Sequence, residues 1–255
     1  MNLIIHNSFH DTTPSHTGDA ILSRPIITTI RDTFPDFKIT LQFEKKHHYF
    51  LGDLGISLTE RYPITGPNFN AWFGVYTDIL NVHGLSYFTH VHSFNRQMEG
   101  QGLPYRLTIP DIHPMLQFPP FQGPEGAVPH GILIENGSSL SHQNFLDMNL
   151  VIPRLVSDFK QHIFYVSAVP PIHNAPNLCN CQDKNLLVFY HISNQCCALI
   201  TRGSGVNAAT YSEENRNKPR AIVGWNYPYK LWDHNFTCCS TYEQLCAFVN
   251  SVKVR

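Results

Sequence analysis

The sequence predicts an α/β protein with two halves, each built on a parallel sheet covered by helices. In the first half, a β-branched run at 2–6 is followed by a helical pattern at 18–34 and an alternating run at 38–43. In the second half, strand-like runs at 131–135 and 162–167 flank another helical pattern. A strand, a helix and a second parallel strand form a right-handed crossover unit, so both halves are expected to contain parallel sheets.

Length and composition agree with this organisation. The chain has 255 residues and domains commonly span about 100–150, so we expect an N-terminal domain at 1–120 and a C-terminal domain at 121–255. A proline-rich stretch at 109–129 has few periodic apolar residues and is expected to be a loop or linker between them. The formal net charge of −1 excludes a broad basic surface, so no nucleic-acid partner is expected.

The remaining elements are expected from the same patterns. Aromatic-rich helical patterns occupy 71–80 and 87–98, whereas the rest of 52–125 has no clear periodicity. The second half continues with a helix at 185–193, a buried strand at 197–201, a helix after Gly205, a strand at 220–224 and a helix at 241–252.

The cell compartment is inferred from what the sequence lacks. The longest apolar runs are strand-sized, far short of the roughly 20 residues of a membrane-spanning helix. The first residues do not have the basic and apolar regions of a signal peptide, so a cytoplasmic protein without a transmembrane segment is expected. All seven cysteines lie in the last third, and an odd number without an export signal favours reduced thiols.

No metal site is expected. Cys179 and Cys181 are separated by one residue, whereas zinc sites usually leave a gap of about two to four, and no matching Cys/His pair follows them. His90 and His92 would share one face of a strand, but no third ligand is identifiable, which favours packing or surface roles.

A turn near the N-terminus is the first candidate for function. Gly18 and Asp19 open the first expected helix, where unpaired N–H groups and the helix dipole favour a negative charge. Asp19 is therefore either a cap or a carboxylate held ionised beside a substrate hydroxyl. Arg24, one turn later, either pairs with Asp19, reaches an anionic ligand or is a solvated surface residue.

Two further turns follow strands of the second half. Asn136, Gly137 and Ser138 provide small polar residues whose N–H groups suit phosphate oxygens, although an ordinary capped loop explains them too. The turn at 202–205 adds a guanidinium and close backbone approach before a helix, a combination suited to a diphosphate. It matches neither the Walker pattern nor Gly-x-Gly-x-x-Gly.

Together these turns resemble the pattern of heptosyltransferase-like glycosyltransferases. The segment 16–25 contains the Gly-Asp pair, apolar residues and a proline, and 30–39 has the Phe-Pro that precedes a strand. The segments 200–205 and 218–224 are similar to the Ser-Gly turn and the Lys-Pro strand of that family. Gly203 stands where the family has an acidic residue, and Val206 and its neighbours replace an expected histidine.

The resemblance implies a GT-B fold, with two Rossmann-like halves whose parallel sheets face across a cleft. It implies Asp19 as the base that deprotonates an acceptor hydroxyl, with Gly18 and Arg24 at the acceptor and 52–125 providing acceptor specificity. It also implies an inverting, metal-independent transferase that uses a nucleotide-sugar as co-substrate and no other cofactor. The donor site would consist of Asn136, Gly137, Ser138, Arg202, Gly203, Ser204, Gly205, Val206 and Asn207.

Two alternatives stay open at this point. One is a non-catalytic nucleotide- or carbohydrate-binding protein that retains the fold. The other is a metal- or thiol-dependent enzyme built on the cysteines.

Overall fold

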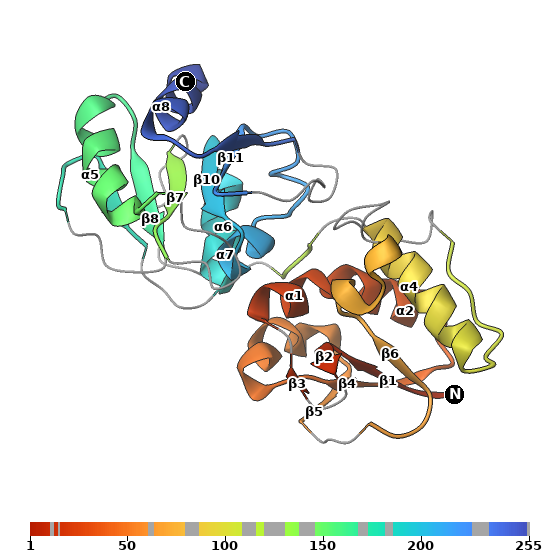
Figure 1. The fold of residues 1–255 in the computed structure, drawn as a ribbon. Coiled ribbons are helices and arrows are strands. Elements are labelled where there is room, and N and C mark those ends of the chain that lie inside the picture. The colour runs from red at the N-terminus through yellow and green to blue at the C-terminus, as the bar shows by residue number, and fades with distance from the viewer. Residues whose placement is uncertain are drawn as a thin grey trace. The chain divides into compact units, whose positions relative to one another are not determined.

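The computed structural model of this chain divides into two compact units, which are described separately. The structure describes residues 1–10, 13–14, 16–60, 64–79, 87–108, 116–119, 131–137, 146–167, 173–181, 186–225 and 235–253. Those of the first unit lie within 1–119, and those of the second within 131–253. Figure 1 shows that each unit has its own sheet and its own helices.

The first unit contains a four-stranded parallel sheet in the order β5-β4-β1-β6. A short antiparallel pair, β2 and β3, follows β1. The strands are β1 (Asn2–His6), β2 (Ser8–His10), β3 (Thr13–Pro14), β4 (Lys38–Gln42), β5 (Ser57–Thr59) and β6 (Asn68–Asn70). The helices are α1 (Thr17–Leu22), α2 (Arg24–Thr33), α4 (Tyr87–Gly100) and the 3-10 helices η1 (Lys45–Phe50), η2 (Gly52–Leu54) and η3 (Phe73–Val75).

Buried apolar residues of the strands and helices form the core of the first unit. Leu3 and Ile5 of β1 are buried, as are Ile26 and Ile30 of α2 and Phe94 of α4. The predicted helix at 18–34 is divided at Ser23 into α1 and α2. Pro25 lies at the start of α2, where its missing N–H group removes no helical hydrogen bond.

The second unit contains a six-stranded parallel sheet in the order β12-β11-β10-β7-β8-β9. Every residue of the central strands β7 and β10 is buried, as expected for a sheet covered on both faces. The strands are β7 (Ile132–Glu135), β8 (Phe164–Ser167), β9 (Leu178–Asn180), β10 (Ala198–Arg202), β11 (Arg220–Val223) and β12 (Thr237–Cys239). The helices are α5 (Met148–Asp158), α6 (Leu186–Gln195), α7 (Gly205–Ala209) and α8 (Tyr242–Ser251).

The α/β class predicted from the sequence is confirmed by these two parallel sheets. The helix predicted over 71–80 is wrong for its first part, which contains only η3, and helical backbone resumes at 77–79. The reason is local: the Asn70 side chain accepts a hydrogen bond from the Trp72 N–H at 3.1 Å, which holds the chain in a turn. Most of the predicted linker at 109–129 lies outside the described residues. No helix in the described ranges is long and apolar enough to cross a membrane.

Candidate functional site

Asp19 lies at the carboxyl edge of the first sheet, the edge at which open α/β sheets bind ligands. It is the third residue of α1, and its half-buried carboxylate accepts a hydrogen bond from the backbone N–H of His16. Burial raises the pKa of Asp19 from 3.8 to about 6, against the opposing effects of the His16 charge and hydrogen bond. A carboxylate with a pKa this close to neutrality is ionised at pH 7 and is a stronger base than an ordinary aspartate.

Two side chains hold the start of α1 in place. The Asn7 amide, directly after β1, donates to the backbone oxygen of Asp19 at 3.1 Å. The buried His47 ring of η1 lies with Nε2 at 3.3 Å from Thr17 Oγ1. Burial lowers the pKa of His47 to about 4, so the ring is neutral at pH 7. The sequence analysis did not expect Asn7 or His47 at this site. Asn7 could have been found, because a polar residue directly after a strand often lies at a ligand-binding edge.

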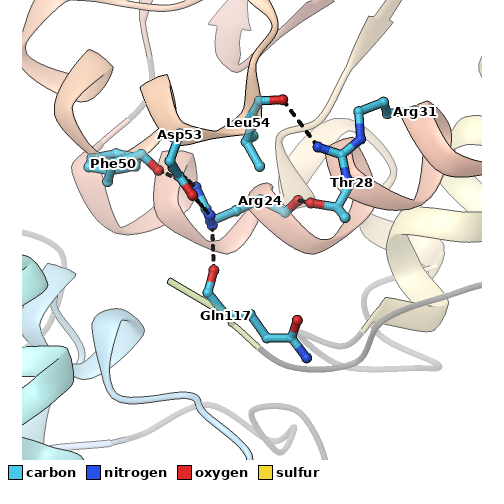
Figure 2. Close-up of polar contacts among 7 residues, drawn as sticks. All are labelled: Arg24, Thr28, Arg31, Phe50, Asp53, Leu54 and Gln117. Atoms are coloured by element: carbon cyan, nitrogen blue, oxygen red, sulfur yellow. Dashed lines mark hydrogen bonds and ion pairs between the residues drawn. The ribbon is translucent and has the colours of Figure 1, made fainter. Parts of the chain in front are cut away.

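Arg24 makes structural contacts within the first unit (Figure 2). Its buried guanidinium pairs with Asp53 and donates to the backbone oxygens of Phe50 at 2.7 Å and Gln117 at 3.0 Å. The partner is therefore Asp53 and not Asp19. These contacts use the guanidinium inside the unit and fix the start of α2 against η1 and η2. Gly18 precedes Asp19 within α1, as expected.

The second unit brings its two predicted turns together at the carboxyl edge of its sheet. Strands β7 and β10 are parallel neighbours, so the turns that follow them lie at the same edge. The Arg202 backbone N–H donates to Glu135 Oε2 at 2.9 Å, and Arg202 Nη1 donates to the Gly137 oxygen at 2.7 Å. Asn136 bonds through its side chain to Asn149 Oδ1 at 3.2 Å. Ser138 lies outside the described residues.

Glu135 is a buried carboxyl that was not expected at the site. Burial raises its pKa to about 7, while hydrogen bonds from the Ser204 hydroxyl and the Arg202 N–H, and the Arg202 charge, act in the opposite direction. The available signal was an acidic residue closing an otherwise apolar strand directly before an Asn-Gly turn.

Within 202–207, some residues lie at the carboxyl edge of the sheet and others point into the interior of the second unit. The Arg202 guanidinium is buried, and it also donates to the Leu146 oxygen at 3.2 Å. Ser204 caps α7, accepting from the Asn207 N–H at 3.2 Å. The Asn207 amide oxygen points inward and accepts from Thr201 Oγ1 at 2.8 Å and Arg220 Nη1 at 2.9 Å. Gly203 and Val206 are buried too, so Ser204 and Gly205 provide the partly exposed part of the turn.

Two observations on the described residues concern possible metal ligands and thiols. The described ranges contain no group of three or more His, Cys, Asp or Glu residues placed to hold a metal ion. Cys179 and Cys181 have free thiols, and burial raises the pKa of Cys181 to about 12, so this thiol is protonated at neutral pH.

The two parallel α/β sheets agree with the fold class expected from the resemblance, and solved glycosyltransferases share this fold. No protein-family model matches the chain, and no curated protein matches it significantly.

Among solved structures, the heptosyltransferase WaaC of E. coli with ADP is similar over 98% of this chain and 97% of its own, with a TM-score of 0.53 and 12% identity. WaaC with ADP-2-deoxy-2-fluoro heptose has a TM-score of 0.55, at 12% identity over 98% of this chain and 99% of its own. A family 9 glycosyltransferase of Veillonella parvula has a TM-score of 0.57 and 11% identity over 99% of this chain and 90% of its own. The predicted resemblance is thus confirmed at the level of the fold.

Proposed function

We propose that this protein transfers a sugar from a nucleotide-sugar donor to an acceptor hydroxyl. The observation that carries the proposal is Asp19, a half-buried carboxylate at the carboxyl edge of the first sheet whose pKa is raised to about 6. The fold shared with glycosyltransferases over nearly the whole chain supports a transferase as the class of activity.

In the proposed reaction, Asp19 accepts the proton of the acceptor hydroxyl as its oxygen attacks the anomeric carbon of the donor. The bond between this carbon and the diphosphate breaks, and the nucleoside diphosphate leaves with the electron pair. A single displacement of this kind inverts the configuration of the anomeric carbon. The ADP and ADP-sugar analogue bound to WaaC support a nucleotide-sugar as the donor class.

We assign donor binding to the second unit, at the turns formed by 136–138 and 202–207. The backbone N–H groups of Ser204 and Gly205 would contact the diphosphate, since small residues allow its oxygens to approach closely. Arg202 would act indirectly, because its guanidinium binds the Gly137 and Leu146 oxygens and so supports the two turns. In this arrangement the leaving group is stabilised by backbone dipoles and no metal ion takes part.

The test begins with nucleotide binding. Thermal unfolding is measured with ADP, UDP, GDP, CDP and dTDP, since a ligand at about 100 times its Kd adds about 2.7 kcal/mol of stability. Nucleotide-sugars with the selected base are then assayed for transfer to a panel of sugar acceptors, using wild type, Asp19→Asn and the control Asp36→Asn, an exposed aspartate of the same unit. Asp19→Asn should lose roughly 100-fold or more in transfer and keep nucleotide binding. Equal transfer by Asp19→Asn and Asp36→Asn would exclude Asp19 as the base.

A second candidate is a nucleotide- or carbohydrate-binding protein without turnover. The buried Arg202 guanidinium favours it, because a cation engaged with two carbonyl oxygens is not available to neutralise a leaving diphosphate. Under this alternative, one nucleotide stabilises wild type and Asp19→Asn equally, and neither protein transfers a sugar.

A further inference from the structure

Each strand of the first sheet ends in a polar side chain at the same level. The parallel register pairs Gln42 of β4 with Thr59 of β5 and with His6 of β1, and pairs His6 with Asn70 of β6. Paired residues of neighbouring strands point to the same face of a sheet. Thr59, Gln42, His6 and Asn70 therefore form one row, the terminal polar row, along the carboxyl edge.

Gln42 at the centre of this row has an unmet hydrogen-bonding group. Its side chain is 2% exposed, and across the part of the chain that the structure describes its terminal nitrogen has no hydrogen-bond partner. Buried polar groups in folded proteins are nearly always paired, because an unpaired one loses its bonds to water without replacement. An amide left in this state at a ligand-binding edge points to a partner that is not part of this chain.

Two other members of the row, His6 and Asn70, are held by Ser8. Asn70 donates to the backbone oxygen of Ser8 at 2.8 Å and accepts from its N–H at 3.3 Å. His6 Nδ1 lies 2.8 Å from Ser8 Oγ. The two ends of the row, Thr59 and Asn70, are half-buried, so the row meets solvent on either side of its buried centre.

The chemistry of the row indicates a hydroxyl group as the missing partner. Its members are two amides, an imidazole and a hydroxyl, with no carboxylate, lysine or arginine among them. A hydroxyl both donates and accepts, so it can pair with either terminal atom of the Gln42 amide. Asn7, the residue after His6, bonds to the backbone of Asp19, which links the row to the proposed base through one residue.

We propose that Gln42 and the terminal polar row bind a hydroxyl of a neutral sugar or polyol, and that this site holds the acceptor. The assignment of the bound sugar as acceptor rests on the proposed function, whereas its binding can be measured without donor or transfer.

The experiment compares the full-length wild type with Gln42→Met and with the control Thr40→Val. Thr40 lies two residues earlier on the same strand and face, half-buried, and is not in the row. Each protein is titrated with glucose, galactose and mannose, and its overall affinity for each hexose is measured. In wild type and Thr40→Val, the Gln42 side-chain N–H₂ signals are also followed by NMR. The unfolding temperature of each free protein is also measured.

We expect at least one hexose to shift the Gln42 signals in wild type and Thr40→Val. Gln42→Met should lose at least 10-fold in affinity and unfold at a temperature about 2–4 °C higher, because the unpaired amide is gone. The proposal is overturned if no hexose shifts the Gln42 signals, if Gln42→Met binds hexose as tightly as wild type, or if this variant is less stable than wild type. If hexose binds at Gln42 but no sugar is transferred, only the proposed transferase activity is contradicted. If sugar is transferred but no hexose binds at Gln42, only the proposed site is contradicted.

Discussion

Arg24 binds both carboxylate oxygens of Asp53, with Nη1 at 2.6 Å from Oδ1 and Nη2 on Oδ2 (Figure 2). The Arg24 side chain is 6% exposed and that of Asp53 28%, so the pair is shielded from water mainly on the arginine side. The same guanidinium reaches the backbone oxygens of Phe50 and Gln117. One residue thereby connects the start of α2 with η1, the 3-10 helix that provides His47, and with the segment at 116–119.

Replacing the Arg24 guanidinium should destabilise the folded protein. Arg24→Met should lower the free energy of unfolding by about 3 kcal/mol, because the buried end of Asp53 and two carbonyl oxygens lose their donor. The matched control is Arg31→Met, since Arg31 on the same helix is 40% exposed and pairs with Asp32, so its loss should cost under about 1 kcal/mol. Urea unfolding of both variants measures the difference, and similar losses would contradict the structural role of Arg24.

The stability of the first unit should depend on Asp19 in a defined pH range. Its pKa in the folded protein is raised from 3.8 to about 6, so the protonated form is favoured by folding and this contribution is lost as pH rises through about 6. Asp19→Asn should therefore gain stability relative to wild type between about pH 4 and pH 7, by about 2 kcal/mol. Unfolding measured across this range checks it, and a constant difference would show that the carboxyl is not buried.

The pH dependence of stability due to His47 should be opposite to that due to Asp19. Burial lowers its pKa to about 4, so the neutral ring contributes stability above its ordinary pKa of 6.5, and this contribution is lost as pH falls through about 4. His47→Gln keeps a side chain able to bond Thr17 but does not titrate, so its stability should fall less steeply than that of wild type on acidification. The same measurement on His48→Gln serves as a control for loss of a neighbouring ring, which in wild type bonds the Phe43 oxygen. Equal slopes for wild type and His47→Gln would contradict the prediction.

Glu135 allows the corresponding test in the second unit. Its pKa is raised from 4.5 to about 7, so the contribution of its protonated form is lost as pH rises through about 7. Glu135→Gln retains an oxygen for the Arg202 N–H and should exceed wild type in stability by about 3 kcal/mol at pH 8, with the difference disappearing below about pH 4.5. A variant less stable than wild type at pH 8 would show that the ionised carboxylate is required for the turn at 202–205.

Several elements were predictable because local patterns encode them. The run at 2–6 matches β1 residue for residue, and 241–252 contains α8 with its Thr241–Gln244 capping box. The three-residue strands β2, β5, β6, β9 and β12 were missed, since segments this short have no measurable periodicity. Their strand conformation depends on pairing with a neighbouring strand.

The candidate site was predictable only in part. Asp19 and the turns at 136–138 and 202–205 follow from small and charged residues placed between strands and helices, which is a local signal. The position of each side chain within these turns is not local. Asn207 belongs to the same segment as Ser204, but its amide is turned inward by Thr201 and Arg220.

The sequence by itself determined the α/β class, the order of most helices and strands, and the turns at which polar groups gather. Only the tertiary structure decided which of those groups meet. It joined Arg24 to Asp53, 29 residues apart, and Arg202 to Glu135, 67 residues apart, and it aligned Gln42 with His6. Such contacts depend on the order and register of strands in a sheet, and no short window of sequence contains both partners.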